Sequence, residues 1–368
     1  MSVSRFIGSR VFRVYIVPGA VFQSVMVGGG YGTGREIVEY FTGYGFLGGL
    51  LGLGVAFVAL ALILALTFVF ARLFKAYDYR SFFKQLLGRG WVAFEVLIIL
   101  QFLLVLAVLA SAAGNILSDN FGMPYGVGLS IMLVVVGVLT FYGRDVIAKA
   151  LTFWSFFLYA VFLAFFVAVF ANNWTPIVEE FGRADVLSGW WRSGLKYAMY
   201  NVASAPLLLY VARDFECRSE ALRSGVVAGA IAIVPAVIFQ VAFFSVYPTI
   251  LDQKIPVYWM MVQLGMTTML VIYSVMLFGT FIETGAGMLQ GINERIDAYL
   301  VEKRGHALTR TSHSLIAVIA IITSAILSLW GITNLIAEGY GTMAWGFLGV
   351  YVLPLVTIGF LRIKRSRQ

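Results

Sequence analysis

The sequence predicts an all-α integral membrane protein whose chain crosses a lipid bilayer ten times. Of its 368 residues, 61% are hydrophobic and only 12% are charged, which is about half the charged fraction of a typical soluble domain. The chain also contains ten apolar runs with the length of about 20 residues that a membrane helix needs. Lys and Arg residues concentrate in every second segment between these runs, which places them on one side of the membrane.

The ten runs are predicted to be helices because lipid cannot satisfy backbone N–H and C=O groups, so each segment must satisfy its own. A β-barrel is excluded, since Leu51–Phe70 is too long for a strand and shows no alternation of polar and apolar residues. The predicted membrane helices, in chain order, are 12–41, 46–73, 91–117, 125–142, 145–171, 190–211, 220–247, 266–291, 311–329 and 332–361. Two short surface helices are expected at 77–87 on the inner side and at 257–264 on the outer side.

The distribution of basic residues predicts the orientation of the chain. With the N-terminus inside, 21 of the 26 Lys and Arg residues fall in cytoplasmic segments, and three fall in outer segments. We therefore expect a multi-pass plasma-membrane protein with both termini in the cytoplasm. The net charge of +8 follows from membrane insertion, so no nucleic-acid partner is expected. Cys217 is the only cysteine, which leaves no disulfide within one chain.

Ten helices divide into two sets of five, and because five is odd the second set must run inverted relative to the first. Within a single transporter domain, 1–368, the predicted repeats are 12–171 and 190–361. Inverted repeats whose first helices are interrupted are typical of secondary transporters. The first and sixth helices are therefore the ones in which breaks are expected.

The first helix, 12–41, carries five glycines among residues 28–34, and each glycine in a helix interior costs about 1 kcal/mol. Thr33 and Glu36 then have the spacing of a capping box. One helix is predicted to end near Gly28 and another to begin near Thr33. The alternative is an unbroken helix that packs closely on a neighbour through its two G-x-x-x-G patterns.

The sixth helix, 190–211, is predicted to break between Asn201 and Pro206. Proline is favoured at the first position of a helix, so a second half is expected to begin at Pro206 with Ser204 or Ala205 as its cap. A simple proline kink is the alternative.

Two interrupted helices at the middle of the bilayer expose peptide dipoles that suit a zwitterion. The start of each half-helix attracts a carboxylate, and the free carbonyls before it attract Na⁺ or an ammonium group. The residues predicted to bind the solute are Gly28, Gly29, Gly30, Tyr31, Gly32, Thr33, Asn201 and Ser204.

The segment VGGGYGTGREIVEYF from Val27 resembles the glycine-rich first-helix motif of the YkvI-like membrane proteins, G-x-G-[FY]-x-T-G-[RQ]-E-I. Those proteins are related to the amino acid–polyamine–organocation superfamily, whose LeuT-type fold has five plus five inverted helices. The resemblance implies that helices 1, 2, 6 and 7 rock against helices 3, 4, 8 and 9. It also implies an ion-coupling site on helix 8 at Thr280, Glu283 and Thr284, facing Val27 and Gly30 of helix 1.

Glu283 stands where the family usually has a hydroxyl residue. We expect it either to ligate Na⁺ or to carry a proton, and a structural glutamate bonded to a neighbouring helix is the alternative. Lys149 on helix 5 occupies the region in which proton-coupled relatives have a lysine, and snorkelling from the cytoplasmic end of the helix is the alternative. Arg35 and Glu338 are predicted to form an outer gate, with pairing of Arg35 to Glu39 one turn away as the alternative.

Enzymatic motifs are missing from the sequence: the glycine run does not complete G-x-G-x-x-G, and neither G-x-x-x-x-G-K-[ST] nor H-E-x-x-H occurs. We therefore expect no enzyme and no cofactor other than Na⁺. The predicted function is ion-coupled secondary transport, by symport, of a small zwitterionic or polar solute such as an amino acid. The alternative is a ligand-sensing receptor subunit of the same fold, without net transport.

Overall fold

The structure is a computed structural model that describes residues 9–142 and 144–366, without the side chains of 29, 120–121, 141–156 and 310. The described chain contains helices and no strand. Every predicted membrane segment is helical. The elements that follow the first segment are α5 (Phe46–Leu73), α7 (Trp91–Phe121), α8 (Tyr125–Tyr142), α9 (Arg144–Asn172), α11 (Trp190–Asn201), η4 (Val202–Asp214), α12 (Arg218–Phe243), α14 (Thr267–Arg304) and α15 (Arg310–Ser328).

The last segment, 332–365, is one continuous helix in which α-helical and π-helical stretches alternate. Its parts are α16 (Ile332–Asn334), η7 (Leu335–Tyr340), α17 (Gly341–Phe347), η8 (Leu348–Val352), η9 (Leu355–Gly359) and α18 (Phe360–Arg365). Of the described helices, six are long and apolar enough to cross a membrane, and a pair bent by 78° at Asn173 makes a seventh. Phe12–Met26 and Tyr125–Thr140 are shorter apolar helices.

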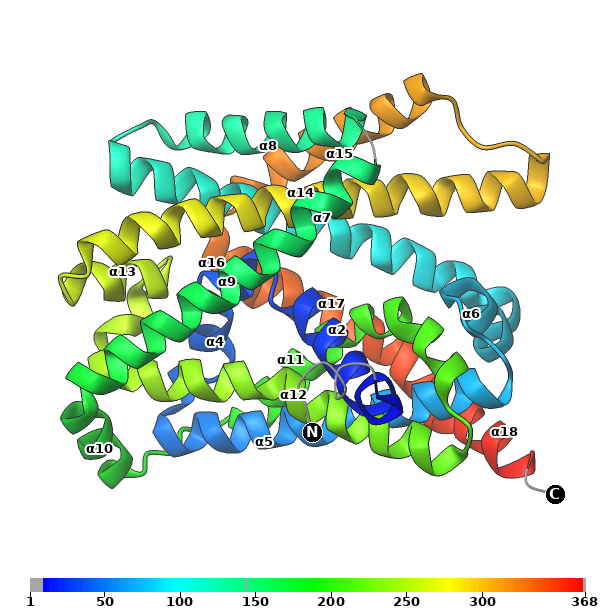
Figure 1. Ribbon diagram of the computed structural model, residues 1–368, viewed down its shortest axis with the longest axis horizontal. Helices are drawn as coiled ribbons and strands as arrows, with labels where there is room; N and C mark the ends of the chain where they lie inside the picture. The colour runs from blue at the N-terminus through cyan, green and yellow to red at the C-terminus, as the bar shows by residue number, and fades with distance from the viewer. Residues whose placement is uncertain (1–8, 143, 367–368) are drawn as a thin grey trace.

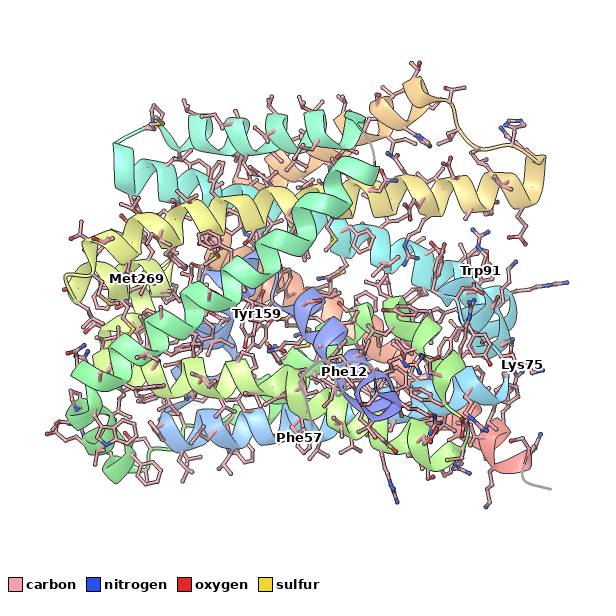
Figure 2. All side chains as sticks on the ribbon, in the orientation of Figure 1. Phe12, Phe57, Lys75, Trp91, Tyr159 and Met269 are labelled. Carbon is pink, nitrogen blue, oxygen red and sulfur yellow. The ribbon has the colours of Figure 1, made fainter. Side chains whose placement is uncertain are left out.

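Short helices cap the two ends of the bundle. Figure 1 shows α10 (Trp174–Arg183) and α13 (Pro256–Gln263) at one end, and α6 (Tyr79–Leu87) and α18 at the other. Figure 2 labels Lys75 and Trp91 near α6, and Met269 at the α13 end. The two surface helices expected from the sequence therefore lie at opposite ends, as predicted. The ends are called the α6 end and the α13 end below.

The membrane helices form two groups. In Figure 1, α7, α8, α14 and α15 lie together above, while α2 (Val17–Met26), α5, α11 and α12 lie below, and α9 crosses in front. The groups correspond to helices 3, 4, 8 and 9 and to helices 1, 2, 6 and 7. The division that the family resemblance implied is therefore present in the molecule.

Small residues let α5 and α12 pack closely. A Cβ atom added at Gly225 would collide with the backbone of Ala65, and one at Gly229 would lie 2.9 Å from the backbone nitrogen of Ala61. Without a hydrophobic force between helices in lipid, such close backbone approach is a main source of association.

The first membrane helix is broken, as predicted. It begins with a π-helical turn, η1 (Phe12–Ile16), and α2 ends at Met26. A single turn, α3 (Gly29–Gly32), follows, and α4 (Arg35–Tyr40) begins after Gly34. Gly34 has φ +82°, a left-handed conformation that glycine adopts without strain.

The sixth helix changes its hydrogen bonding at the predicted place but does not restart at Pro206. The α-helix α11 ends at Asn201 and continues as the 3₁₀ helix η4, with Pro206 inside it and no side-chain cap at its start. The prediction of a new helix with Pro206 at its first position was therefore wrong. The tighter 3₁₀ winding redirects the chain at Asn201 without a gap.

Candidate functional site

Hydrogen bonds from three elements hold the break in the first helix. The Thr33 hydroxyl donates to the carbonyl of Gly30 (2.6 Å) and accepts from the N–H of Arg35 (3.2 Å). The Tyr273 hydroxyl, from α14, donates to the carbonyl of Gly32 (2.9 Å). The N–H of Val257, in α13, donates to the carbonyl of Thr33 (3.2 Å). The irregular backbone is therefore fixed by protein groups, as a buried break in a membrane requires.

The predicted capping box does not form. The residue before α4 is Gly34, not Thr33, and the Thr33 hydroxyl accepts from the first N–H of the helix, that of Arg35. Glu36 does not turn back to the backbone. Its carboxylate accepts a hydrogen bond from the hydroxyl of Tyr200, on α11.

A cavity of about 70 Å³ lies between the broken first helix, the junction of α11 with η4, and α7 and α14. Its polar lining comes from the backbone of Gly28 and Gly30 and from side chains of several elements. These side chains are Glu36, Gln101, Tyr200, Asn201, Ser204, Thr284 and Tyr340.

Four of the residues predicted to bind solute line this cavity: Gly28, Gly30, Asn201 and Ser204. Three others do not. The ring of Tyr31 packs against Phe239 at 5.7 Å, Gly32 lies against Leu277, and the hydroxyl of Thr33 is used within the break. Gly29 belongs to α3, and its surroundings lie outside the described residues.

Glu36 is the cavity residue that sequence reasoning missed. Its side chain is 5% exposed and lies against the Cα of Gly30, where an added Cβ atom would collide with the carboxylate. The signal in the sequence was a carboxylate next to a predicted break. That signal was interpreted as a helix cap, which hid its place in the cavity.

Four buried tyrosines close the cavity toward the α13 end. The rings of Tyr200 and Tyr340 stack at 4.8 Å, Tyr40 lies 5.5 Å from Tyr200, and Tyr197 lies 5.8 Å from Tyr40. The hydroxyl of Tyr40 also donates to the carbonyl of Ile336 (2.9 Å). We call these four residues the tyrosine cluster.

A second cavity of about 660 Å³ extends toward the α6 end. Its lining includes Tyr79 on α6 and Glu294 and Arg295 on α14. Five residues line both this cavity and the central one: Val25, Phe102, Leu207, Thr284 and Met288. The central cavity therefore adjoins a wide space on one side and the tyrosine cluster on the other.

The residues predicted for ion coupling meet in a third, small cavity of about 30 Å³. It is lined by Ser24, Val27, Leu158, Tyr159, Thr280, Glu283 and Thr284. Figure 2 labels Tyr159 on α9. Gly30, also predicted here, lines the central cavity instead. The carbonyls of Met26 and Val27 accept none of the backbone hydrogen bonds recorded outside the helices of the described chain.

The predicted gate pair is not formed in this structure. Arg35 pairs with Glu39 at 2.9 Å and donates to the carbonyls of Leu251 (2.7 Å) and Gln253 (3.0 Å). Glu338 is exposed at the surface of the bundle. The prediction of an Arg35–Glu338 pair was therefore wrong for this conformation, because a partner one helical turn away is already in reach. The side chain of Lys149 lies outside the described residues.

Comparison with known proteins supports the fold. No family model matches the chain. It is 25% identical over 346 residues to the uncharacterized membrane protein YkvI of Bacillus subtilis (strain 168), covering 89% of this chain and 92% of that protein. The resemblance predicted from the first-helix motif is thereby confirmed.

Solved structures of transporters share the fold of this chain at low sequence identity. A Na⁺-coupled sialic acid symporter in a substrate-bound outward-open state matches with a TM-score of 0.65 and 12% identity, over 92% of this chain and 78% of the symporter. An Eremococcus coleocola manganese transporter matches with a TM-score of 0.57 and 14% identity, over 96% and 80%. Mhp1 in an inward-facing conformation matches with a TM-score of 0.54 and 14% identity, over 91% and 76%. The predicted LeuT-type helical membrane fold is therefore confirmed.

Proposed function

We propose that this protein is an ion-coupled secondary transporter, a symporter, of a small zwitterionic or polar solute such as an amino acid. The observation that carries the proposal is the central cavity between the interrupted first helix and the α11–η4 junction. Secondary transporters bind their solutes at such breaks near the middle of the membrane. The solved structures of similar fold include a Na⁺-coupled symporter, which supports the same class of function.

The proposed route crosses the molecule along the bundle. The tyrosine cluster closes the central cavity toward the α13 end, and the 660 Å³ cavity lies on the α6 side. The basic residues favour an orientation in the plasma membrane with the α6 end on the cytoplasmic side. In that orientation the central cavity opens toward the cytoplasm, and the conformation is inward-facing. Rocking of α2, α5, α11 and α12 against α7, α8, α14 and α15 would open the opposite side.

The proposed coupling site is the 30 Å³ cavity around Glu283. It gathers oxygen atoms from Ser24, Thr280, Thr284 and Glu283, next to Val27, whose carbonyl accepts none of the hydrogen bonds recorded between elements of the described chain. Carbonyl groups at a broken membrane helix coordinate Na⁺ in this class of transporter. A carboxylate at this depth is costly unless it faces a cation or a proton, so Glu283 is proposed to hold Na⁺ or H⁺.

Flux into proteoliposomes tests the proposal. Purified protein should take up radiolabelled solute with saturation, and an inward Na⁺ or H⁺ gradient should drive accumulation above the outside concentration. A thermal-shift screen with and without Na⁺ would identify the solute to test, since a ligand that binds the folded protein raises its unfolding temperature. Binding without flux would instead indicate the ligand-sensing receptor, and unsaturable flux would indicate a channel.

A further inference from the structure

The carboxylate of Glu36 lies buried in the central cavity without a cationic partner. None of the ion pairs recorded among the described residues involves it, and its hydrogen-bond partner is the hydroxyl of Tyr200. One neutral hydroxyl is a weak partner for a buried charge, since an unpaired ion in a membrane interior costs several kcal/mol. A cation in this cavity would therefore stabilise the ionised form of Glu36 by pairing with it.

A second buried acceptor belongs to a residue that lines the same cavity. The side chain of Gln101 is 6% exposed, lines the cavity, and its Oε1 atom has no hydrogen-bond partner. A buried acceptor left unpaired costs about 1–3 kcal/mol. Glu36 and Gln101 lie on different elements, α4 and α7, so two independent side chains call for a ligand that donates hydrogen bonds.

The rest of the lining suits an organic cation better than a metal ion. No Lys, Arg or His residue belongs to the described lining, and Glu36 is its one carboxylate. The remaining surface is mostly apolar or aromatic, and comes from Val25, Met26, Ile98, Phe102, Val105, Leu207 and Met288. Aromatic faces attract organic ammonium groups, whereas hard metal ions favour several charged or carbonyl oxygen ligands.

We infer that Glu36 is the counter-ion of an ammonium group on the transported solute, with Gln101 accepting from the same group and the apolar lining receiving the carbon body. This inference rests on the proposed function in one respect, that the central cavity is the solute site. It narrows the substrate class to organic amines. A carboxylate on the solute is not required, because no basic side chain of the described lining would meet it.

Three solutes that share one branched carbon body test the inference in detergent-solubilised full-length protein. They are isoamylamine, which has only the amine, leucine, which has both groups, and 4-methylpentanoate, which has only the carboxylate. Isothermal titration should show binding of isoamylamine at least as tight as that of leucine and no binding of 4-methylpentanoate. Glu36→Gln should weaken isoamylamine binding by about 30-fold or more, as loss of one member of a buried charge pair does.

Glu179→Gln is the matched control, because it makes the same chemical change on the exposed surface of α10; it should leave the affinity unchanged. The ranking of the three solutes on the wild-type protein stands even if Glu36→Gln fails to fold. Equal binding of 4-methylpentanoate, absence of isoamylamine binding, or binding of Mn²⁺ in its place would overturn the inference. Amine binding without flux in proteoliposomes would overturn the proposed function and leave the inference standing. Coupled uptake of a solute without an amine would overturn the inference and leave the proposed function standing.

Discussion

At the scale of single residues, two glycines of the broken helix differ in what surrounds them. A Cβ atom added at Gly30 would collide with the carboxylate of Glu36 and lie 3.5 Å from the hydroxyl of Tyr340. At Gly28 the nearest atom would be a methyl carbon of Thr284 at 3.6 Å, an ordinary contact. The lack of a side chain at Gly30 therefore makes room for Glu36 in the cavity.

Gly30→Ala should weaken solute binding by about tenfold or more, because overpacking costs about 1–3 kcal/mol and displaces the carboxylate. Gly28→Ala, in the same interrupted segment of the first helix, should cause a clearly smaller loss of affinity. Titration of both variants with the best solute measures the difference. Equal losses for the two variants would contradict this account of Gly30.

Glu283 is the residue on which the coupling proposal depends. Glu283→Gln keeps the shape of the side chain but removes its charge, so Na⁺ or H⁺ should no longer bind with the wild-type affinity. We expect gradient-driven accumulation in proteoliposomes to be lost, while exchange of labelled for unlabelled solute across the membrane persists. Normal accumulation by this variant would show that Glu283 is structural.

At the scale of elements, the sequence predicted where helices are interrupted better than what the interruptions expose. The glycine run placed the first break correctly, because glycines weaken a helix whatever surrounds it. The role of Glu36 could not be obtained in this way. Whether its side chain caps α4 or enters the cavity depends on the left-handed turn at Gly34 and on Tyr200, which lies 164 residues along the chain.

Pro206 illustrates the same limit in the sixth helix. Its missing N–H predicts an irregularity, but a 3₁₀ helix and a new α-helix both satisfy that local requirement. In the structure η4 packs against α5 and α2, contacts that the local sequence around Pro206 does not specify. The helical conformation of the predicted membrane segments, by contrast, followed from their long apolar runs, because lipid leaves a helix as the way to satisfy the backbone.

Packing of α5 on α12 gives a prediction about stability. Gly225→Ala should lower the unfolding temperature, because its Cβ atom would overlap the backbone of Ala65, and overpacking of this kind costs about 1–3 kcal/mol. Gly54→Ala is the control on α5, since no atom lies within 4 Å of its added Cβ atom. A thermal unfolding curve of each variant measures the effect, and an unchanged curve for Gly225→Ala would show that the helices can separate without cost.

An ion pair at the α6 end gives a prediction about pH. Arg10 donates two hydrogen bonds, of 2.8 and 2.9 Å, to the carboxylate of Glu220 at the start of α12. The hydrogen bond from Arg10 lowers the pKa of Glu220 from its ordinary value. A lowered pKa in the folded state contributes stability above the unfolded pKa of about 4.3, and this contribution disappears as pH falls through the folded value.

The wild-type protein should therefore unfold at a slightly higher temperature than Glu220→Gln at pH 7 and low salt. The difference should vanish as the pH falls below about 4, and it should shrink in high salt because the pair is exposed. Thermal unfolding of both proteins across this pH range measures it. A difference that grows on acidification would have the wrong sign for this pair.

At the scale of the whole molecule, the two helix groups and the cavities between them imply a direction of access. The 660 Å³ cavity adjoins the central site and includes α6 and the C-terminal half of α14, whereas another cavity of about 430 Å³ near Ser118 and Lys254 has no lining residue in common with the central site. In an alternating-access carrier, the central site should connect to only one of these two cavities at a time.

Gly287 offers a place to measure that access. It lines the 660 Å³ cavity, it is exposed, and open space surrounds its Cα. Cys217 is an exposed free cysteine, so Cys217→Ser provides a background without native thiols. In that background, Gly287→Cys in sealed vesicles of known orientation should react with a membrane-impermeant thiol reagent added on the cytoplasmic side and not on the outer side. Ser118→Cys, which lines the 430 Å³ cavity, should show the opposite preference.

Ligands should then change the rate at which the cysteine at position 287 is labelled. A ligand that binds better to the opposite conformation shifts the population toward it in proportion to its differential affinity. If α2, α5, α11 and α12 rock against the other group, the ion and solute that drive uptake should slow labelling at position 287 and speed it at position 118. Labelling of position 287 from the outer side would contradict the orientation. Rates at both positions that stay constant under saturating ligand would contradict a rocking carrier and favour a fixed binding protein.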